Sequence, residues 1–297
     1  MPVNDALGVR MKEKYEMKAR SYLTPGVPVA IRIDGKAFHT FTKGFKKPFD
    51  RVLMTSMQKT MQYLCQNIQG CVFGYTQSDE ITLILIDYQT IDTDCWFGYQ
   101  IQKVCSVAAS MATMAFNKYF AQEVDKWGVE TFGLEWYEGG TNDTEVINTP
   151  EWKLAGVYSK AINKGAMFDA RCFNIPKEEV ANLIYWRQLD ATRNSIQMVA
   201  QANFPHKELL GRTCNMLRDK LFLEKGINWN SYPVDCKRGA ACIRKVVEVP
   251  CDNDGIALRS RWIIDNNMPI IKGEGRNYVN NAILYFDEIN VYEEDLK

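Results

Sequence analysis

The sequence predicts an α+β fold built on a ferredoxin-like βαββαβ sheet, with additional helical and C-terminal elements. Two observations lead to this fold class. Segments with the composition of strands and of helices follow one another in the order strand, helix, strand, strand, helix, strand. The chain has 297 residues, of which 46% are hydrophobic and 24% charged, and this composition is typical of a globular protein with a substantial core.

The first strand and the first helix are predicted at 27–34 and 50–69. β-Branched residues alternate along the stretch "VPVAIRID", which is the pattern of a strand. Asp50 stands where the N-cap of the helix is expected. The residues that share one apolar face of this helix are Leu53, Met57, Met61, Leu64 and Ile68.

A hairpin and a long helix follow. The stretches 71–76 and 81–88 read as two strands, and the turn between them contains Ser78, Asp79 and Glu80. The helical pattern then runs from 96 to about 124, and its stretch of small residues, "SVAASMATMA", suits close packing.

The segment 138–165 is rich in turn residues and is expected to be a flexible loop, because it contains "EGGTND", Pro150 and Gly165. A fourth strand is predicted at 166–175. The helix after it opens with a proline, a residue that favours the first turn of a helix.

This order of elements predicts that acidic residues from distant positions meet at one edge of the sheet. The helical crossover makes the first two strands parallel, so both end at the same edge, where the following hairpin also turns. Asp34 ends the first strand, and Asp79 and Glu80 lie in the hairpin turn. We therefore expect three carboxylates at this rim.

Converging carboxylates repel one another and are best tolerated beside a cation. Oxygen ligands without His or Cys favour magnesium, and two such ions can bridge the oxygens of a phosphoryl displacement. Gly35 and the amides of Lys36, Ala37 and Phe38 suit a phosphate cradle, and the ammonium groups of Lys36 and Lys47 suit a triphosphate. The alternative is that "DG" and "SDE" are ordinary solvent-facing turns.

Charge and cysteine content narrow the class of protein. Lys and Arg together number 36, as do Asp and Glu, so the net charge of zero does not by itself indicate a nucleic-acid partner. The nine cysteines form no Cys-x-x-Cys pair and there are only two histidines, which argues against zinc and for reduced thiols in the cytoplasm. No apolar run approaches ~18 residues, so neither a membrane span nor an export signal is expected.

Five ordered motifs carry a resemblance to a known family. They are "RIDGKAFHTF", "GFKKPFD", "GYTQSDE", "FDAR" and "WRQLD" followed by Asn194. Together they resemble the tRNA-His guanylyltransferase family and its relatives, the 3′–5′ nucleotide-adding enzymes, over about residues 10–245.

The resemblance implies a palm-like catalytic domain, similar to that of polymerases and nucleotidyl cyclases, with two magnesium ions. Members of the family activate the 5′ end of a tRNA with ATP, or use an existing 5′-triphosphate, and the 3′-hydroxyl of an incoming GTP then attacks that end. They commonly assemble as tetramers, so a homotetramer is expected. The expected parts are the first part of the palm (1–137), the flexible loop (138–165), the remainder of the palm with its helices (166–245) and a C-terminal extension of the same domain (246–297).

The resemblance also implies roles for individual residues. Asp34 and Asp79 look like metal ligands, as does the carbonyl of Gly35, and Glu80 looks like a supporting catalytic carboxylate. Residues implied to bind the nucleotide are Asp34, Gly35, Lys36, Ala37, Phe38, His39, Lys47, Ser78, Asp79, Arg171 and Asn194. Residues implied to contact RNA are Arg187, Gln188 and Asp190.

Plainer interpretations remain for some of these residues. His39 fits a hydrogen-bonded turn, and Asp50 fits a helix cap. Asp190 fits an exposed helix face with internal salt bridges, and Trp186 is expected in the core rather than as a base-stacking platform.

Two departures from the family pattern refine the expected function. Thr192 stands where the eukaryotic branch has a histidine associated with tRNA-His selection, and Phe49 replaces the usual asparagine of the Lys-Pro motif. These features favour the broader bacterial, archaeal and viral members that repair tRNA 5′ ends. A nucleotidyl cyclase-like enzyme on the same palm and a non-catalytic RNA-binding protein are the alternatives.

Overall fold

The computed structural model describes residues 5–90, 92–136, 147–250 and 256–284. Its centre is one antiparallel sheet with strand order β4-β1-β3-β2-β5-β6. The strands are β1 (Val29–Gly35), β2 (Cys71–Gln77), β3 (Glu80–Leu85), β4 (Phe168–Asn174), β5 (Ala240–Pro250) and β6 (Ile256–Asp265).

The predicted ferredoxin-like arrangement is confirmed. β3 lies between β1 and β2 and is antiparallel to both, so β1 and β2 run in the same direction and end at the same edge. The strands of the βαββαβ pattern form the continuous part β4-β1-β3-β2, and β5 and β6 extend it beyond β2.

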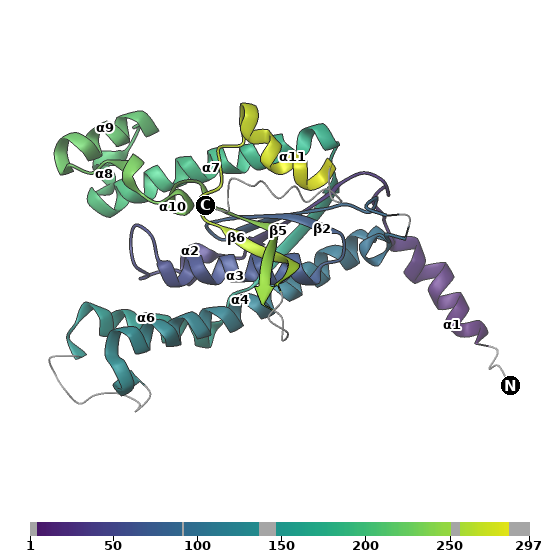
Figure 1. Cartoon of the computed structure of the whole chain (residues 1–297). Coiled ribbons are helices and arrows are strands. Elements are labelled where there is room, and N and C mark those ends of the chain that lie inside the picture. The colour runs from purple at the N-terminus through teal and green to yellow at the C-terminus, as the bar shows by residue number, and fades with distance from the viewer. Residues whose placement is uncertain (1–4, 91, 137–146, 251–255, 285–297) are drawn as a thin grey trace.

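Helices cover both faces of the sheet (Figure 1). On one face lie α3 (Arg51–Asn67) and α4 (Ile101–Phe132), and α6 (Pro150–Lys164) packs against α4. On the other face lie α7 (Lys177–Asn203) and α11 (Asn277–Leu284). The remaining helical elements are α1 (Ala6–Met11), η1 (Lys12–Glu16), η2 (Met17–Ala19), α2 (Phe38–Phe41), η3 (Trp96–Tyr99), η4 (Gly133–Trp136), α8 (His206–Leu209), α9 (Cys214–Lys225), η5 (Trp229–Ser231), α10 (Val234–Arg238) and η6 (Gly273–Arg276).

The alternation of side chains along β1 separates two cores. Ile31 and Ile33 point into the core beneath α3 and α4, where burial of each such side chain contributes about 1.5–3 kcal/mol. Ala30 belongs to the core beneath α7 and α11. Arg32 and Asp34 share the α7 face with Ala30, so this face becomes polar toward the end of the strand.

The prediction of a flexible loop at 138–165 is wrong for its second half, which is helix α6. Thr149 caps this helix by accepting a hydrogen bond from the Trp152 amide, and Pro150 occupies its first turn. Tyr158 and Ala161 are buried against the core that contains α4. Pro150 and Gly165 therefore mark the two ends of a helix, and the part of the predicted loop at 138–146 lies outside the described residues.

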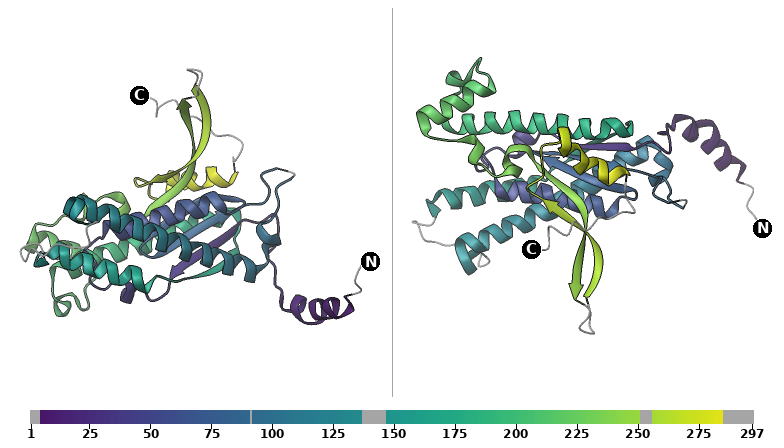
Figure 2. Two further views of the ribbon diagram at one scale, coloured as in Figure 1. Left: turned by 90° about the horizontal axis from the view of Figure 1, so that it is seen from below. Right: turned by 45° about the horizontal axis from the view of Figure 1, so that its top comes forward.

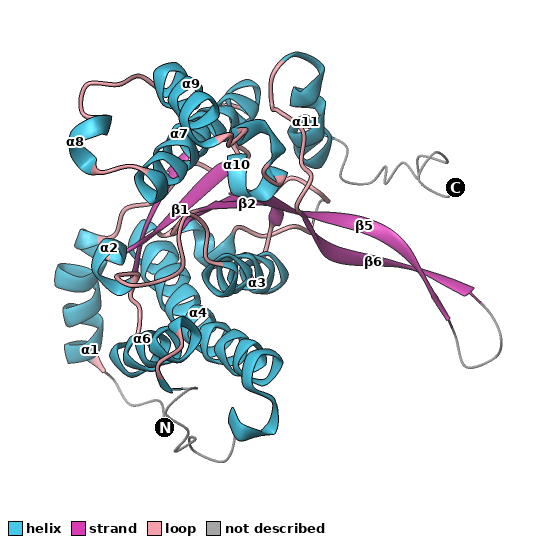
Figure 3. Ribbon diagram, turned by 90° about the vertical axis from the view of Figure 1, so that its left-hand side faces the viewer, coloured by secondary structure: helices cyan, strands magenta, loops and turns pink. Residues whose placement is uncertain are grey.

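The C-terminal part continues the sheet, because β5 pairs with β2 and β6 pairs with β5. The boundary expected at 245 falls inside β5, so 246–250 and 256–265 belong to the same sheet. Figures 2 and 3 show the distal part of the β5–β6 hairpin as an arm that leaves the body of the molecule, and Figure 2 shows α1 leaving it elsewhere. None of the described helices combines the length and the apolar character needed to cross a membrane.

Candidate active site at the rim of the sheet

The sheet register brings the predicted carboxylates together. Asp34 on β1 is the cross-strand partner of Glu80 on β3, and on its other side it pairs with Asp169 on β4. The Gly35 amide donates a hydrogen bond to the Asp79 carbonyl, with N and O 3.1 Å apart. The predicted meeting of Asp34, Asp79 and Glu80 at one edge is confirmed.

Two of these carboxylates are poorly neutralised by the protein. Burial raises the pKa of Asp34, and the negative charges of Glu80 and Asp169 raise it further. Burial also raises the pKa of Asp79, although its hydrogen bond from the Ser78 hydroxyl, 2.9 Å long, acts in the opposite direction. Within the described part of the chain, neither carboxylate forms an ion pair.

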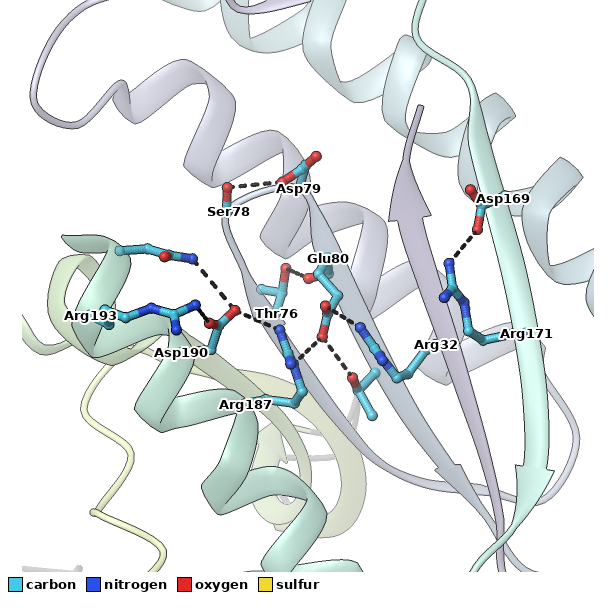
Figure 4. A network of polar contacts seen from close by, with 12 residues as sticks. Arg32, Thr76, Ser78, Asp79, Glu80, Asp169, Arg171, Arg187, Asp190 and Arg193 are labelled. Atoms are coloured by element: carbon cyan, nitrogen blue, oxygen red, sulfur yellow. Dashed lines mark hydrogen bonds and ion pairs between the residues drawn. The ribbon is translucent and has the colours of Figure 1, made fainter. Parts of the chain in front are cut away.

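Glu80 is in a different state, because two arginines bind it (Figure 4). It is buried, and its Oε2 accepts from the Arg32 guanidinium at 2.7 Å. Its Oε1 accepts from Nε of Arg187, also at 2.7 Å. Both carboxylate oxygens are thus engaged by arginines of the protein, and the supporting catalytic role of Glu80 stays a prediction.

The protein supplies only part of the ligand set that a hard cation such as magnesium needs. No group of three His, Cys, Asp or Glu side chains arranged to hold a metal occurs among the described residues. The available donors are the carboxylates of Asp34 and Asp79 and the backbone of Gly35. Magnesium usually keeps several waters and binds through one or two carboxylates together with substrate phosphates, so these donors suit it.

Gly35 has a packing role that the sequence did not reveal. A Cβ atom at this position would lie 2.2 Å from the ring of Phe38. Phe38 itself is buried among the rings of Phe41, Phe116 and Phe168. The glycine therefore lets the segment after β1 fold back over its own strand.

The phosphate cradle predicted after Gly35 needs a correction. The Lys36 amide donates to the Met167 carbonyl at 2.9 Å, so it is not available for a phosphate. Ala37 adopts a left-handed conformation with φ of 54° and leads into α2. The side chains of Lys36 and His39 are exposed beside the rim, whereas Phe38 offers only its backbone.

The Lys-Pro motif lies in the loop before α3, where Asp50 forms several hydrogen bonds. Asp50 accepts hydrogen bonds from the amides of Leu53 (3.0 Å) and Lys46 (2.9 Å) and from the Tyr158 hydroxyl (2.7 Å). The helix-cap interpretation of Asp50 is confirmed by the contact with the Leu53 amide, and the three contacts together engage both carboxylate oxygens. Lys47 lies in the same loop with its side chain exposed.

The predicted RNA contacts on α7 do not all reach the surface. Arg187 is buried against Glu80, and its guanidinium also binds Asp190 at 2.8 Å. Gln188 is 2% exposed, because its amide donates to the Pro269 carbonyl and accepts from the Ile271 amide. An RNA contact by Arg187 or Gln188 is therefore wrong for this structure, and both residues join α7 to its neighbours.

The other candidates on this face remain accessible. Asp190 is half-buried and binds Arg193 as well as Arg187, and the Asn194 amide lies 3.5 Å from its carboxylate. Arg171 on β4 is exposed and pairs with Asp169 at 3.1 Å (Figure 4).

Two residues at the rim were missed. Asp169 carries a third charge next to Asp34, and Arg32 neutralises Glu80. The alternation of β1 and the "FDAR" motif contained the signal for both, because cross-strand neighbours share a face. Trp186 is a further correction: it is 51% exposed and does not lie in the core.

The chain resembles proteins that are named for the transfer of a nucleotide, which is a reaction that this site could support. A sequence model of the family described as tRNAHis guanylyltransferase (Thg1) matches residues 9–176. A probable tRNA(His) guanylyltransferase of Dictyostelium discoideum is 23% identical over 84% of this chain and 88% of its own length.

Solved structures extend the likeness to nearly the whole chain. A bacterial tRNA(His) guanylyltransferase-like protein in complex with ATP is 39% identical, with a TM-score of 0.71, and the alignment covers 94% of this chain and 100% of that one. A structure of such a bacterial protein in complex with GTP is 37% identical at the same coverage, with a TM-score of 0.68.

Proposed function

Because the chain belongs to the tRNAHis guanylyltransferase (Thg1) family of nucleotidyltransferases, we propose that it adds nucleotides in the 3′–5′ direction to the 5′ end of tRNA. ATP would activate a 5′-monophosphate, and GTP would be the incoming nucleotide. The ATP and GTP complexes of the bacterial relatives support these two substrates.

One observation carries the proposal. Asp34 and Asp79 lie at the same sheet edge with raised pKa values and, within the described residues, without an ion pair. Such a pair suits two magnesium ions, which when bound would neutralise the carboxylates and polarise the phosphates of the substrate. The Gly35 carbonyl is the proposed backbone ligand.

The protein's own groups have distinct tasks in this proposal. Asp34 and Asp79 are the proposed carboxylate ligands of the magnesium ions, and the triphosphate would bind to those ions rather than to the carboxylates themselves. Glu80, fixed by Arg32 and Arg187 at 2.7 Å each, keeps β3 and α7 in register beside them. Proposed triphosphate contacts come from the exposed residues Lys36, His39, Lys47, Ser78 and Arg171 and from half-buried Asn194.

The proposed RNA substrate is a tRNA with an incomplete 5′ end. The chain carries Thr192 in place of the histidine associated with tRNA-His selection, and the bacterial guanylyltransferase-like proteins are 37–39% identical to it. Asp190, half-buried on α7, stays a proposed RNA contact. A homotetramer and a cytoplasmic location also remain predictions.

The test uses purified protein, magnesium, ATP and GTP with two 5′-monophosphorylated substrates, a full-length tRNA-His and a tRNA that lacks its first nucleotide. Products are resolved to single-nucleotide length. We expect the truncated tRNA to be extended until its 5′ end is paired. Addition to tRNA-His alone would contradict the repair function, and release of pyrophosphate from GTP without any addition would favour the cyclase-like alternative.

A further inference from the structure

An exposed indole ring stands beside the rim, at Trp186 on α7. Tryptophan is highly buried on average, but this side chain is 51% exposed. Its neighbour Arg187 and the preceding turn of α7, through Ile184, face the sheet and are buried. Trp186 therefore lies at the border between the packed face of α7 and solvent, next to the carboxylate site.

Two guanidinium groups fix the orientation of this ring. The guanidinium carbon of Arg187 lies 4.3 Å from the ring centroid of Trp186, and that of Arg32 lies 5.4 Å from it. Each guanidinium is itself held by a different oxygen of Glu80 at 2.7 Å. The ring is thus positioned before any ligand binds, which lowers the entropy cost of binding.

The open surface next to Trp186 leads to the proposed metal ligands. Arg32 precedes Asp34 by two residues on the same face of β1, which corresponds to roughly 7 Å along the strand. On the neighbouring strand β4, the side chains of Asp169 and Arg171 are 62% and 55% exposed. Because these two side chains are exposed, a nucleotide with its phosphates at Asp34 can reach the indole with its base along this edge of the sheet.

We propose that Trp186 is a stacking platform for a nucleobase of the substrate. This inference rests on the proposed function, because it requires a nucleotide at the rim. The base belongs either to the bound nucleoside triphosphate or to the 5′-terminal nucleotide of the RNA. Every base has a π-face, so a flat, preset indole accepts bases without reading their sequence.

The test compares Trp186→Leu, which removes the ring but keeps an apolar side chain, with Trp186→Phe, which keeps a ring. KM is measured separately for GTP and for a 5′-triphosphorylated tRNA that lacks its first nucleotide, a substrate that needs no activation by ATP. We expect Trp186→Leu to raise one of these KM values by about tenfold or more. Trp186→Phe is expected to change it by less than about threefold, because a smaller ring still stacks.

The pattern of KM values identifies the stacked base. A rise for GTP alone assigns it to the incoming nucleotide, and a rise for the tRNA alone assigns it to the RNA end. Unchanged KM values in an active Trp186→Leu protein would overturn the inference, and so would equal losses in both variants, because these would indicate a packing role. Met198→Ala is the matched control, since Met198 is 39% exposed on the same helix and is expected to leave both KM values unchanged.

A binding measurement covers the case in which Trp186→Leu does not fold. Stacking of a base quenches indole emission, so GTP or the tRNA should quench the wild-type protein more than Trp186→Phe. Equal quenching of the two proteins would overturn the stacking role. A different outcome is a wild-type protein that shows the stronger quenching by GTP or tRNA and yet adds no nucleotide. That result would contradict the proposed function but would support the stacking role of Trp186.

Discussion

The rim of the sheet and the loop before α3 both carry acidic residues that belong to the family motifs. These residues differ in how far the protein itself provides partners for their carboxylates. Asp50 in the loop accepts three hydrogen bonds from protein donors. Asp34 at the rim has no ion pair among the described residues, and Asp79 accepts from Ser78. A carboxylate whose acceptor sites are filled stabilises the fold, whereas one left without a counter-charge at a surface is available to a ligand.

The largest effect is expected from Asp79→Ala. Removal of this carboxylate should abolish nucleotide addition, with a loss of about a thousandfold or more, because it removes a proposed metal ligand while relieving repulsion at the rim. The rate of addition to a 5′-triphosphorylated tRNA measures the effect. Thermal unfolding serves as the control and should show a fold at least as stable as the wild type. Retained activity would exclude Asp79 as a metal ligand.

Asp50→Ala should instead act on stability. It removes the cap of α3 and leaves the buried Tyr158 hydroxyl without its acceptor, so we expect a loss of about 2–4 kcal/mol in the free energy of unfolding. Urea denaturation measures this loss. Asp50→Asn keeps an acceptor and should lose less, and both variants should keep kcat close to the wild type at low temperature. A large loss of kcat in a folded Asp50→Asn protein would contradict the contrast between loop and rim.

Lys47→Ala tests the loop for a function that its neighbour Asp50 lacks. Loss of one charged contact to a phosphate should slow activation of a 5′-monophosphorylated tRNA by about tenfold. Addition to a 5′-triphosphorylated tRNA should change much less. Equal losses on the two substrates would remove the activation-specific role, and Lys43→Ala, an exposed lysine of the same segment, is the matched control.

The smallest expected effect is on the way in which the stability of the fold depends on pH. The folded-state pKa values of Asp34 and Asp79 are raised above their ordinary value of 3.8. Their contribution to stability is therefore fully present below that value and is lost as the pH rises through the raised values. Without magnesium, the double variant Asp34→Asn, Asp79→Asn should lack this loss.

The measurement is the urea midpoint of both proteins between pH 4 and pH 8 without metal. The difference in favour of the double variant should grow with pH. In the wild type alone, added magnesium should raise the midpoint near neutral pH. An identical pH dependence of the two proteins would contradict the raised pKa values.

Sequence reasoning reached the elements whose signals are local. The four strands of the βαββαβ pattern were expected within a few residues of their bounds, and the helix from Asp50 had its cap assigned. The two further strands, β5 and β6, were not predicted. The prediction was wrong where the same residue types occur both in loops and at helix ends. Pro150 and Gly165 suggested a loop, but they begin and end α6.

The candidate site likewise has features that the sequence predicted and features that it did not. The order of strands and helices determines that Asp34, Asp79 and Glu80 meet, because a crossover helix makes β1 and β2 run in the same direction. Which of the three is neutralised depends on partners far along the chain: Arg187 lies 107 positions after Glu80.

The sequence by itself therefore determined the fold class, the family and the position of the rim, since these follow from local periodicity and ordered motifs. Only the tertiary structure decided that Gln188 is buried under Pro269, that Trp186 is exposed, and that the Lys36 amide binds Met167. The physical reason is that burial and charge pairing depend on which distant segments meet, and neither periodicity nor composition records those meetings.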